Sequence, residues 1–117
     1  MATNPVRGEI YQVDWHPARG SEQAGDRPSL VIQTDAANRN PNYPNTIVAT
    51  ISRGGRSVPT HILLRPDSSN GLAVECYAKC EQIMTVSKDR LGKRYGKLSD
   101  ADMHSVDEAV RLALQLG

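Results

Sequence analysis

The apolar residues of this chain change their spacing near residue 99, and this change limits what the chain can fold into. Before it they alternate with polar residues or form short runs, as Tyr11, Val13 and Trp15 do, which is typical of β-strands. We therefore predict a mainly β fold that ends in one amphipathic α-helix, with Ser99 as its N-cap. The apolar stripe of this helix recurs every three or four residues, at Met103, Val106, Val110, Ala113 and Leu114.

Turn-forming residues divide the β part into short strands. Gly, Pro, Asn, Ser and Asp cluster between the apolar segments. The segment 35–45 is rich in Asn, has little to bury and is expected to be a loop. Short, closely spaced strands favour a small barrel or a curled sheet. The expected strands cover residues 9–15, 30–32, 46–51, 60–64, 72–77, 81–86 and 93–97.

The size of the chain, 117 residues, leaves room for a single domain, 1–117. It has no apolar run long enough to span a bilayer, and residues 1–7 lack the apolar core of a signal peptide, so a cytoplasmic protein is expected. In a strand, Cys76 and Cys80 would lie roughly 13 Å apart. This is too far for a disulfide, and the three scattered histidines complete no zinc spacing. We expect free thiols, no metal and no other cofactor.

The charged residues are unevenly distributed, although the net charge is only +1. Residues 15–66 contain six basic and three acidic side chains, 88–97 contain five basic ones and Asp89, and the C-terminal stretch is acidic. A segregated basic surface can hold a polyanion, but solvated charged faces are also common. The charge pattern permits binding to RNA without requiring it.

The usual catalytic motifs are missing from the sequence. It contains no P-loop, no H-E-x-x-H, no G-x-S-x-G and no carboxylate cluster at metal-binding spacing. An enzyme built this way needs a substrate that supplies much of the chemistry. RNA does so, because its own 2′-OH lies beside the phosphodiester. Arg suits this reaction, since its planar fork of donors matches phosphate oxygens.

Residues 20–28 (GSEQAGDRP) place Arg27 where a polar loop meets a buried strand, and Arg7-Gly8-Glu9 opens the first strand. These segments resemble the corresponding parts of the MazF/PemK family of toxin ribonucleases. The resemblance covers nearly the whole chain into the final helix, through residues 30–35, 47–52, 59–61, 81–83 and 90–92.

The resemblance implies a fold, an activity and partners. The fold is an SH3-like curled barrel of short, mostly antiparallel strands, of the CcdB/MazF type. The activity is cleavage of single-stranded mRNA at a short sequence, without a metal ion or the ribosome, leaving 2′,3′-cyclic phosphate and 5′-OH ends. The implied partners are a second copy of the chain and a MazE-like antitoxin whose disordered tail folds onto the RNA groove.

The resemblance also carries over to individual residues. It makes Arg27 catalytic and Ser52 its hydroxyl partner, although the family has Thr at that position, and Thr50 is a possible substitute. Glu22 matches a family carboxylate that can accept the 2′-OH proton. The residues expected to contact RNA are Ser21, Gln23, Glu81 and Gln82.

Several alternatives remain open at this point. Arg27 can instead form a strand-edge ion pair with Asp26 or Glu22, and Glu22 can be a solvated loop charge. His16 and His61 titrate in the right range to protonate the leaving 5′-oxygen, but each can be structural. The exposed Tyr43 can stack on a base. The chain as a whole can instead be a CcdB-like inhibitor of DNA gyrase, or a nucleic-acid-binding barrel with weak catalysis.

Overall fold

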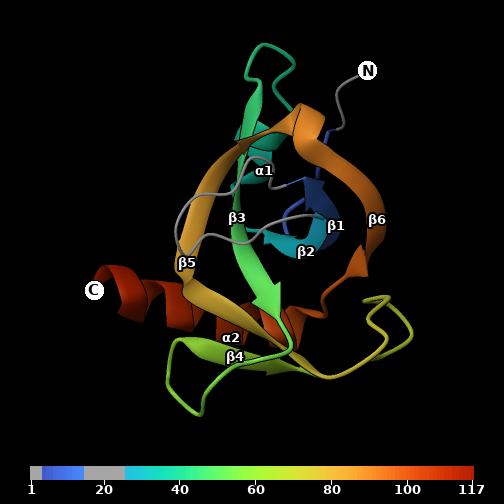
Figure 1. Cartoon of the computed structure of the whole chain (residues 1–117). Helices are drawn as coiled ribbons and strands as arrows, with labels where there is room; N and C mark the ends of the chain where they lie inside the picture. The colour runs from blue at the N-terminus through green and yellow to red at the C-terminus, as the bar shows by residue number, and fades with distance from the viewer. Residues whose placement is uncertain (1–3, 15–25) are drawn as a thin grey trace.

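Six strands form one antiparallel sheet in the order β4-β5-β3-β2-β1-β6 in a computed structural model that describes residues 4–14 and 26–117 (Figure 1). The predicted mainly β fold with a C-terminal helix is confirmed. No helix in the described part of the chain is long and apolar enough to cross a membrane. The elements are β1 (Glu9–Asp14), β2 (Asp26–Val31), α1 (Asp35–Asn38), β3 (Asn45–Ser52), β4 (His61–Leu64), β5 (Cys76–Ser87), η1 (Lys88–Arg90), β6 (Leu91–Lys97) and α2 (Asp100–Leu114).

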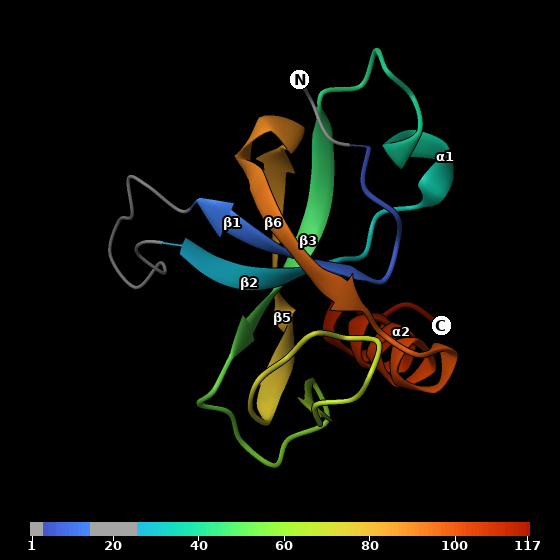
Figure 2. The same ribbon diagram turned by 90° about the vertical axis from the view of Figure 1, so that its right-hand side faces the viewer.

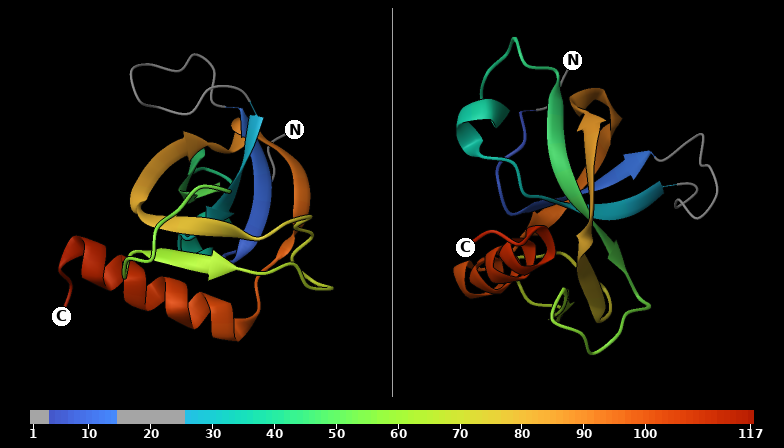
Figure 3. Two further views of the ribbon diagram at one scale, coloured as in Figure 1. Left: turned by 60° about the horizontal axis from the view of Figure 1, so that its bottom comes forward. Right: turned by 90° about the vertical axis from the view of Figure 1, so that its left-hand side faces the viewer.

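The sheet is strongly curled, and its two faces bury different sets of side chains. Figures 1 and 2 show β5 and β6 curving around β1, β2 and β3, with α1 toward one end of the molecule and α2 toward the other. The concave side encloses Tyr11, Val13, Val31, Val48, Val86 and Leu91. The other side packs against α2, which runs along β4 and β5 (Figure 3). This second core contains Ile10, Leu30, Ile51, Leu64, Cys76, Ala78, Cys80, Leu98, Met103, Val106 and Ala109.

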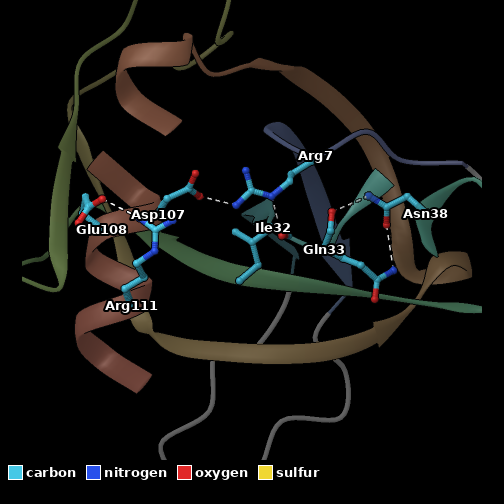
Figure 4. Close-up of polar contacts among 7 residues, drawn as sticks. All are labelled: Arg7, Ile32, Gln33, Asn38, Asp107, Glu108 and Arg111. Atoms are coloured by element: carbon cyan, nitrogen blue, oxygen red, sulfur yellow. Dashed lines mark hydrogen bonds and ion pairs between the residues drawn. The ribbon is translucent and has the colours of Figure 1, made fainter. Parts of the chain in front are cut away.

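Helix α2 begins where its capping sequence predicts. The Ser99 Oγ accepts a hydrogen bond from the backbone N–H of Asp102 at 3.1 Å, which satisfies one of the donors that the first turn leaves free. Arg7 ties the N-terminal segment to the middle of the helix: its Nη2 pairs with Asp107, and its Nε donates to the Ile32 carbonyl at 3.0 Å (Figure 4). The predicted N-cap at Ser99 is confirmed.

The predicted loop 35–45 contains the short helix α1 and one fully buried polar side chain, so the prediction of a loop with little to bury was wrong. The carboxamide of Asn38, which is fully buried, accepts a hydrogen bond from Gln33 Nε2 at 3.0 Å and donates to the Gln33 carbonyl (Figure 4). It also accepts a hydrogen bond from Thr46 Oγ1 at 2.8 Å. Lys88 is 2% exposed, and its Nζ donates to the carbonyls of Asn38 and Asn40. Polar side chains thus anchor this segment, because their hydrogen bonds offset the cost of burying them.

Strand β5 corrects the prediction of two strands over 72–77 and 81–86. It is one strand of 12 residues, and residues 72–75 lie outside it. Ala49 of β3 pairs with Ile83, but the next residue, Thr50, pairs with Lys79. Residues 80–82 are therefore extra relative to β3 and form a bulge, which re-aims side chains without ending the strand. Both cysteines are buried and free, as predicted.

Candidate active site

Four neighbouring strands align polar residues in rows across the sheet. Thr50 of β3 pairs with Ser29 of β2 on one side and with Lys79 of β5 on the other, and Lys79 pairs with His61 of β4. Two residues further along β3, Ser52 pairs with Tyr77. Arg27 lies two residues before Ser29 on β2, toward the end of β3 that carries Ser52.

These residues share one face of the sheet, which we call the site face. Paired residues point to the same side, and alternate residues of a strand do as well. Arg27, Thr50, Ser52, Lys79 and His61 follow this rule, whereas the intervening Ile51, Ala78 and Cys80 belong to the core under α2. The site face continues the concave side of the sheet beyond its apolar core.

A cavity of about 440 Å³ brings Arg27 and Ser52 together, and we call it the Arg27 cavity. Its volume is within the range of ordinary ligand pockets. Arg53 adds a second guanidinium to the lining. Leu72, Val74 and Tyr95 form an apolar wall. The cavity therefore combines cationic donors, a hydroxyl and an apolar surface.

The hydroxyl of Ser52 is available to a ligand, and that of Thr50 is engaged. Ser52 Oγ accepts a hydrogen bond from the backbone N–H of Gly54 at 3.2 Å, which leaves its own proton to be donated. Thr50 is 4% exposed, and its Oγ1 donates to Gln82 Oε1 at 2.9 Å. Of the two candidate hydroxyls, only that of Ser52 lines a cavity with Arg27.

A second cavity of about 330 Å³ lies on the other side of Ser52, and we call it the Lys79 cavity. Ser52 and Gly54 line both cavities, so the two adjoin. The remaining lining residues include three with basic side chains, Arg56, His61 and Lys79. Ser52 and Gly54 thus lie between two adjoining cavities, each of which contains basic side chains.

The imidazole of His61 makes two hydrogen bonds. Its Nδ1 accepts the backbone N–H of Arg56 at 3.0 Å, so the neutral ring carries its proton on Nε2, which lies 2.8 Å from Glu81 Oε2. Burial raises the pKa of Glu81. The hydrogen bonds from His61, from the backbone of Glu81 itself and from the Thr60 side chain outweigh this effect and hold the pKa below its ordinary value. Glu81 is accordingly an anion near neutral pH.

The residues predicted for the site fall into three groups. Arg27 and Ser52 lie together in one cavity. Glu81 and Gln82 lie on the bulge of β5, where they bind His61 and Thr50. The predicted Glu22, Ser21, Gln23 and His16 lie outside the described residues. Within 4–14 and 26–117, no cluster of three or more His, Cys, Asp or Glu side chains could hold a metal ion.

Sequence reasoning missed Lys79, Arg56 and Tyr95 as residues of the two cavities. A signal for Lys79 was present: Cys76, Ala78 and Cys80 alternate with Tyr77 and Lys79, which is the pattern of a strand with one buried face. Ending the predicted strand at Tyr77 concealed it. Arg56 and Tyr95 are brought to the cavities by long-range folding, for which the local sequence holds no signal.

Comparisons with known proteins agree with the sequence resemblance. The family described as PemK-like, MazF-like toxin of type II toxin-antitoxin system matches residues 6–114. Endoribonuclease MazF9 of Mycobacterium tuberculosis is 39% identical over 114 residues, which are 94% of this chain and 96% of that protein. Endoribonuclease EndoA of Bacillus subtilis is 40% identical over 113 residues, 94% of either chain.

Solved structures are similar over the same length. An endoribonuclease from Mycobacterial species, in complex with its cognate antitoxin, superposes with a TM-score of 0.79 at 26% identity, over 97% of each chain. MazF from Deinococcus radiodurans superposes with a TM-score of 0.77 at 18% identity, over 96% of this chain and 97% of that one. The solved structures confirm the predicted MazF-type fold, and the sequence relatives confirm the predicted endoribonuclease class. The chain belongs to the PemK-like, MazF-like toxin family of type II toxin-antitoxin systems.

Proposed function

We propose that this chain acts as a single toxin domain that cuts single-stranded mRNA at a short sequence, without a metal ion and without the ribosome. The products are a 2′,3′-cyclic phosphate and a 5′-OH end. The observation that supports this most is that Arg27 and Ser52 line one cavity. Loss of messages would then arrest growth.

The reaction needs charge stabilisation more than it needs a protein nucleophile. The 2′-oxygen attacks the adjacent phosphorus, the bond from phosphorus to the 5′-oxygen breaks, and the non-bridging oxygens carry added charge in between. Arg27 donates N–H groups to these oxygens, and Ser52 adds an O–H donor. An arginine keeps its proton in proteins, so Arg27 stabilises charge and transfers no proton.

The two proton transfers belong to other groups. His61 uses Nδ1 for the Arg56 N–H and Nε2 for Glu81, so neither nitrogen is free to serve the 2′-OH or the leaving 5′-oxygen. We assign His61 a positioning role. Glu22, His16 and water remain the candidate proton carriers, and Ser21 and Gln23 remain candidate RNA contacts of the same segment.

The proposed partners are a second copy of the chain in the cytoplasm and a cognate antitoxin. Leu112, Leu114 and Leu116, at and beyond the end of α2, are each more than half exposed, which suits burial against another chain. A structural relative was solved with its cognate antitoxin. An antitoxin with a disordered acidic tail would complement the basic side chains of the two cavities.

The experiment that tests this function is incubation of the purified protein with a long single-stranded RNA in EDTA, followed by mass spectrometry of the product ends. We expect cyclic-phosphate ends, and Arg27→Ala should lower kcat by about 100- to 1,000-fold. Arg111→Gln is the matched control, because Arg111 pairs with Glu108 on α2, on the opposite side of the sheet. Intact RNA together with inhibited gyrase would instead indicate a CcdB-like toxin. Intact but retained RNA would indicate a binding barrel, and cleavage only with added metal would refute the mechanism.

A further inference from the structure

We propose that the Lys79 cavity is a second phosphate subsite, which binds the phosphodiester next to the scissile one through Arg56 and Lys79. The inference rests on the proposed function, since it takes the scissile phosphate to lie between Arg27 and Ser52. It adds a ligand group and two residues that neither the resemblance nor the comparisons assign.

The position of the cavity fits a neighbouring phosphate of the same strand. Ser52 and Gly54 separate it from the Arg27 cavity and line both. Along β3, the row of Ser52 and the row of Thr50 and Lys79 are two residues apart, which is about 7 Å. An extended nucleotide spans a similar length, so a strand with one phosphate at Ser52 brings the next one to the Lys79 cavity.

The charge of the cavity fits an anion. Within the described part of the chain, no carboxylate forms an ion pair with Arg56 or Lys79. The nearest acid in sequence, Glu81, accepts a hydrogen bond from His61 and does not line the cavity. The guanidinium of Arg56 matches phosphate oxygens as a fork of donors, and the ammonium of Lys79 serves such an oxygen as a point charge.

The loop that carries Arg56 is held in place before any ligand binds. Gly55 lies against the ring of Tyr77 so closely that a Cβ there would be 2.3 Å from Tyr77 Cδ1. The N–H of Arg56 is bound by His61 Nδ1, and the Arg56 carbonyl accepts the N–H of Val58 at 2.8 Å. A fixed backbone on both sides of Arg56 lowers the entropy lost when the side chain binds an anion.

A phosphate that does not react is bound about equally in the ground state and the transition state. Removing a contact to it should therefore raise KM and change kcat much less. We expect Lys79→Gln and Arg56→Gln each to raise KM about tenfold. This factor corresponds to the lower end of the range of free energies for a hydrogen bond to a charged group. The same changes should lower the slope of log KM against log salt by about 0.7, the value for one phosphate of a single strand.

The decisive experiment uses oligonucleotides that contain a mapped cut site and one neutral methylphosphonate at each position in turn. On the oligonucleotide neutralised at the bound phosphate, Lys79→Gln and the unaltered protein should have equal KM values, and at the other positions the tenfold difference should remain. Arg111→Gln should show no difference on any of them. A Lys79 effect that is equal at all positions, or no effect, would overturn the subsite.

Binding separates this inference from the proposed function. A 2′-deoxy substitution at the cut site blocks cleavage, and fluorescence anisotropy then measures affinity alone. Binding that depends on Lys79 in a protein that cleaves no RNA would keep the subsite and overturn the nuclease. Cleavage of RNA together with binding that does not depend on Lys79 or Arg56 would keep the nuclease and overturn the subsite. Circular dichroism melting curves check that both variants are folded.

Discussion

His61 Nε2 donates a hydrogen bond to Glu81 Oε2 over 2.8 Å, and this contact joins the bulge of β5 to β4. The other ring nitrogen holds the backbone of Arg56. One imidazole thus links a carboxylate on the bulge to the loop between β3 and β4. The ring thus connects the loop that carries Arg56 to the part of β5 that directly follows Lys79.

Replacing His61 should affect binding of RNA more than the chemical step. His61→Ala removes the acceptor for the Arg56 N–H, and we expect KM to rise roughly three- to tenfold, the value of one net hydrogen bond. His61→Asn keeps a shorter acceptor and should restore part of the loss. The pH profile of kcat, measured from pH 5 to 9, should keep both limbs in either variant. If the alkaline limb of the kcat profile, which reports deprotonation of the general acid, disappeared in these variants, His61 would be that acid.

Glu81 should make stability depend on pH in a predictable direction. Its pKa is lower in the folded chain than in the unfolded chain, so its contribution is complete above the unfolded value and is lost as pH falls through the folded value. The stability difference between the native protein and Glu81→Gln should therefore be largest near pH 7 and shrink below about pH 4. Urea unfolding at a series of pH values measures it. A difference that grows on acidification would mean that the carboxylate is destabilised by folding.

Ser52 and Thr50 should separate activity from stability. Ser52→Ala is expected to slow cleavage, because it removes the hydroxyl that shares a cavity with Arg27. Thr50→Val leaves Gln82 Oε1 without its donor and should cost about 1 kcal/mol in unfolding free energy, with a smaller effect on kcat. Ser52→Thr should retain activity, since the added methyl only restrains χ1. Single-turnover cleavage measures the activity of each variant, and urea titration measures its stability. A larger loss of kcat in Thr50→Val than in Ser52→Ala would make Thr50 the hydroxyl partner of Arg27.

Lys88 should be required for stability and not for RNA. Its buried ammonium donates to the carbonyls of Asn38 at 2.9 Å and Asn40 at 3.2 Å. Lys88→Met keeps most of the volume but leaves both acceptors unpaired, so we expect a loss of about 2 kcal/mol in unfolding free energy. Lys97→Met, at an exposed position of β6, is the control. An unchanged denaturation midpoint for Lys88→Met would show that water replaces the ammonium.

Local signals in the sequence were enough for some elements. The three- and four-residue spacing from Met103 onward and the cap at Ser99 act within one helical turn, and both predicted α2 correctly. The association of Arg27 with Ser52 was reached through a resemblance, and the structure places both residues in the lining of one cavity.

Other features depend on contacts between distant residues. Asn38 is buried because Gln33 and Thr46 satisfy its carboxamide, and its own neighbours give no sign of this. The bulge at 80–82 exists because β5 pairs with β3 on both sides of it, so Glu81 and Gln82 looked like the start of a new strand. Lys79 was missed for the same reason.

The alternation along β5 has a consequence for how the protein can evolve. Cys76, Ala78 and Cys80 face α2, while the intervening Tyr77 and Lys79 face the opposite way. Deleting or inserting one residue before the bulge would exchange the two sets, placing thiols on the outside and an ammonium in the core. Descendants of this chain can therefore exchange the side chain at position 79 without disturbing the core, but insertions and deletions in this segment would disturb it.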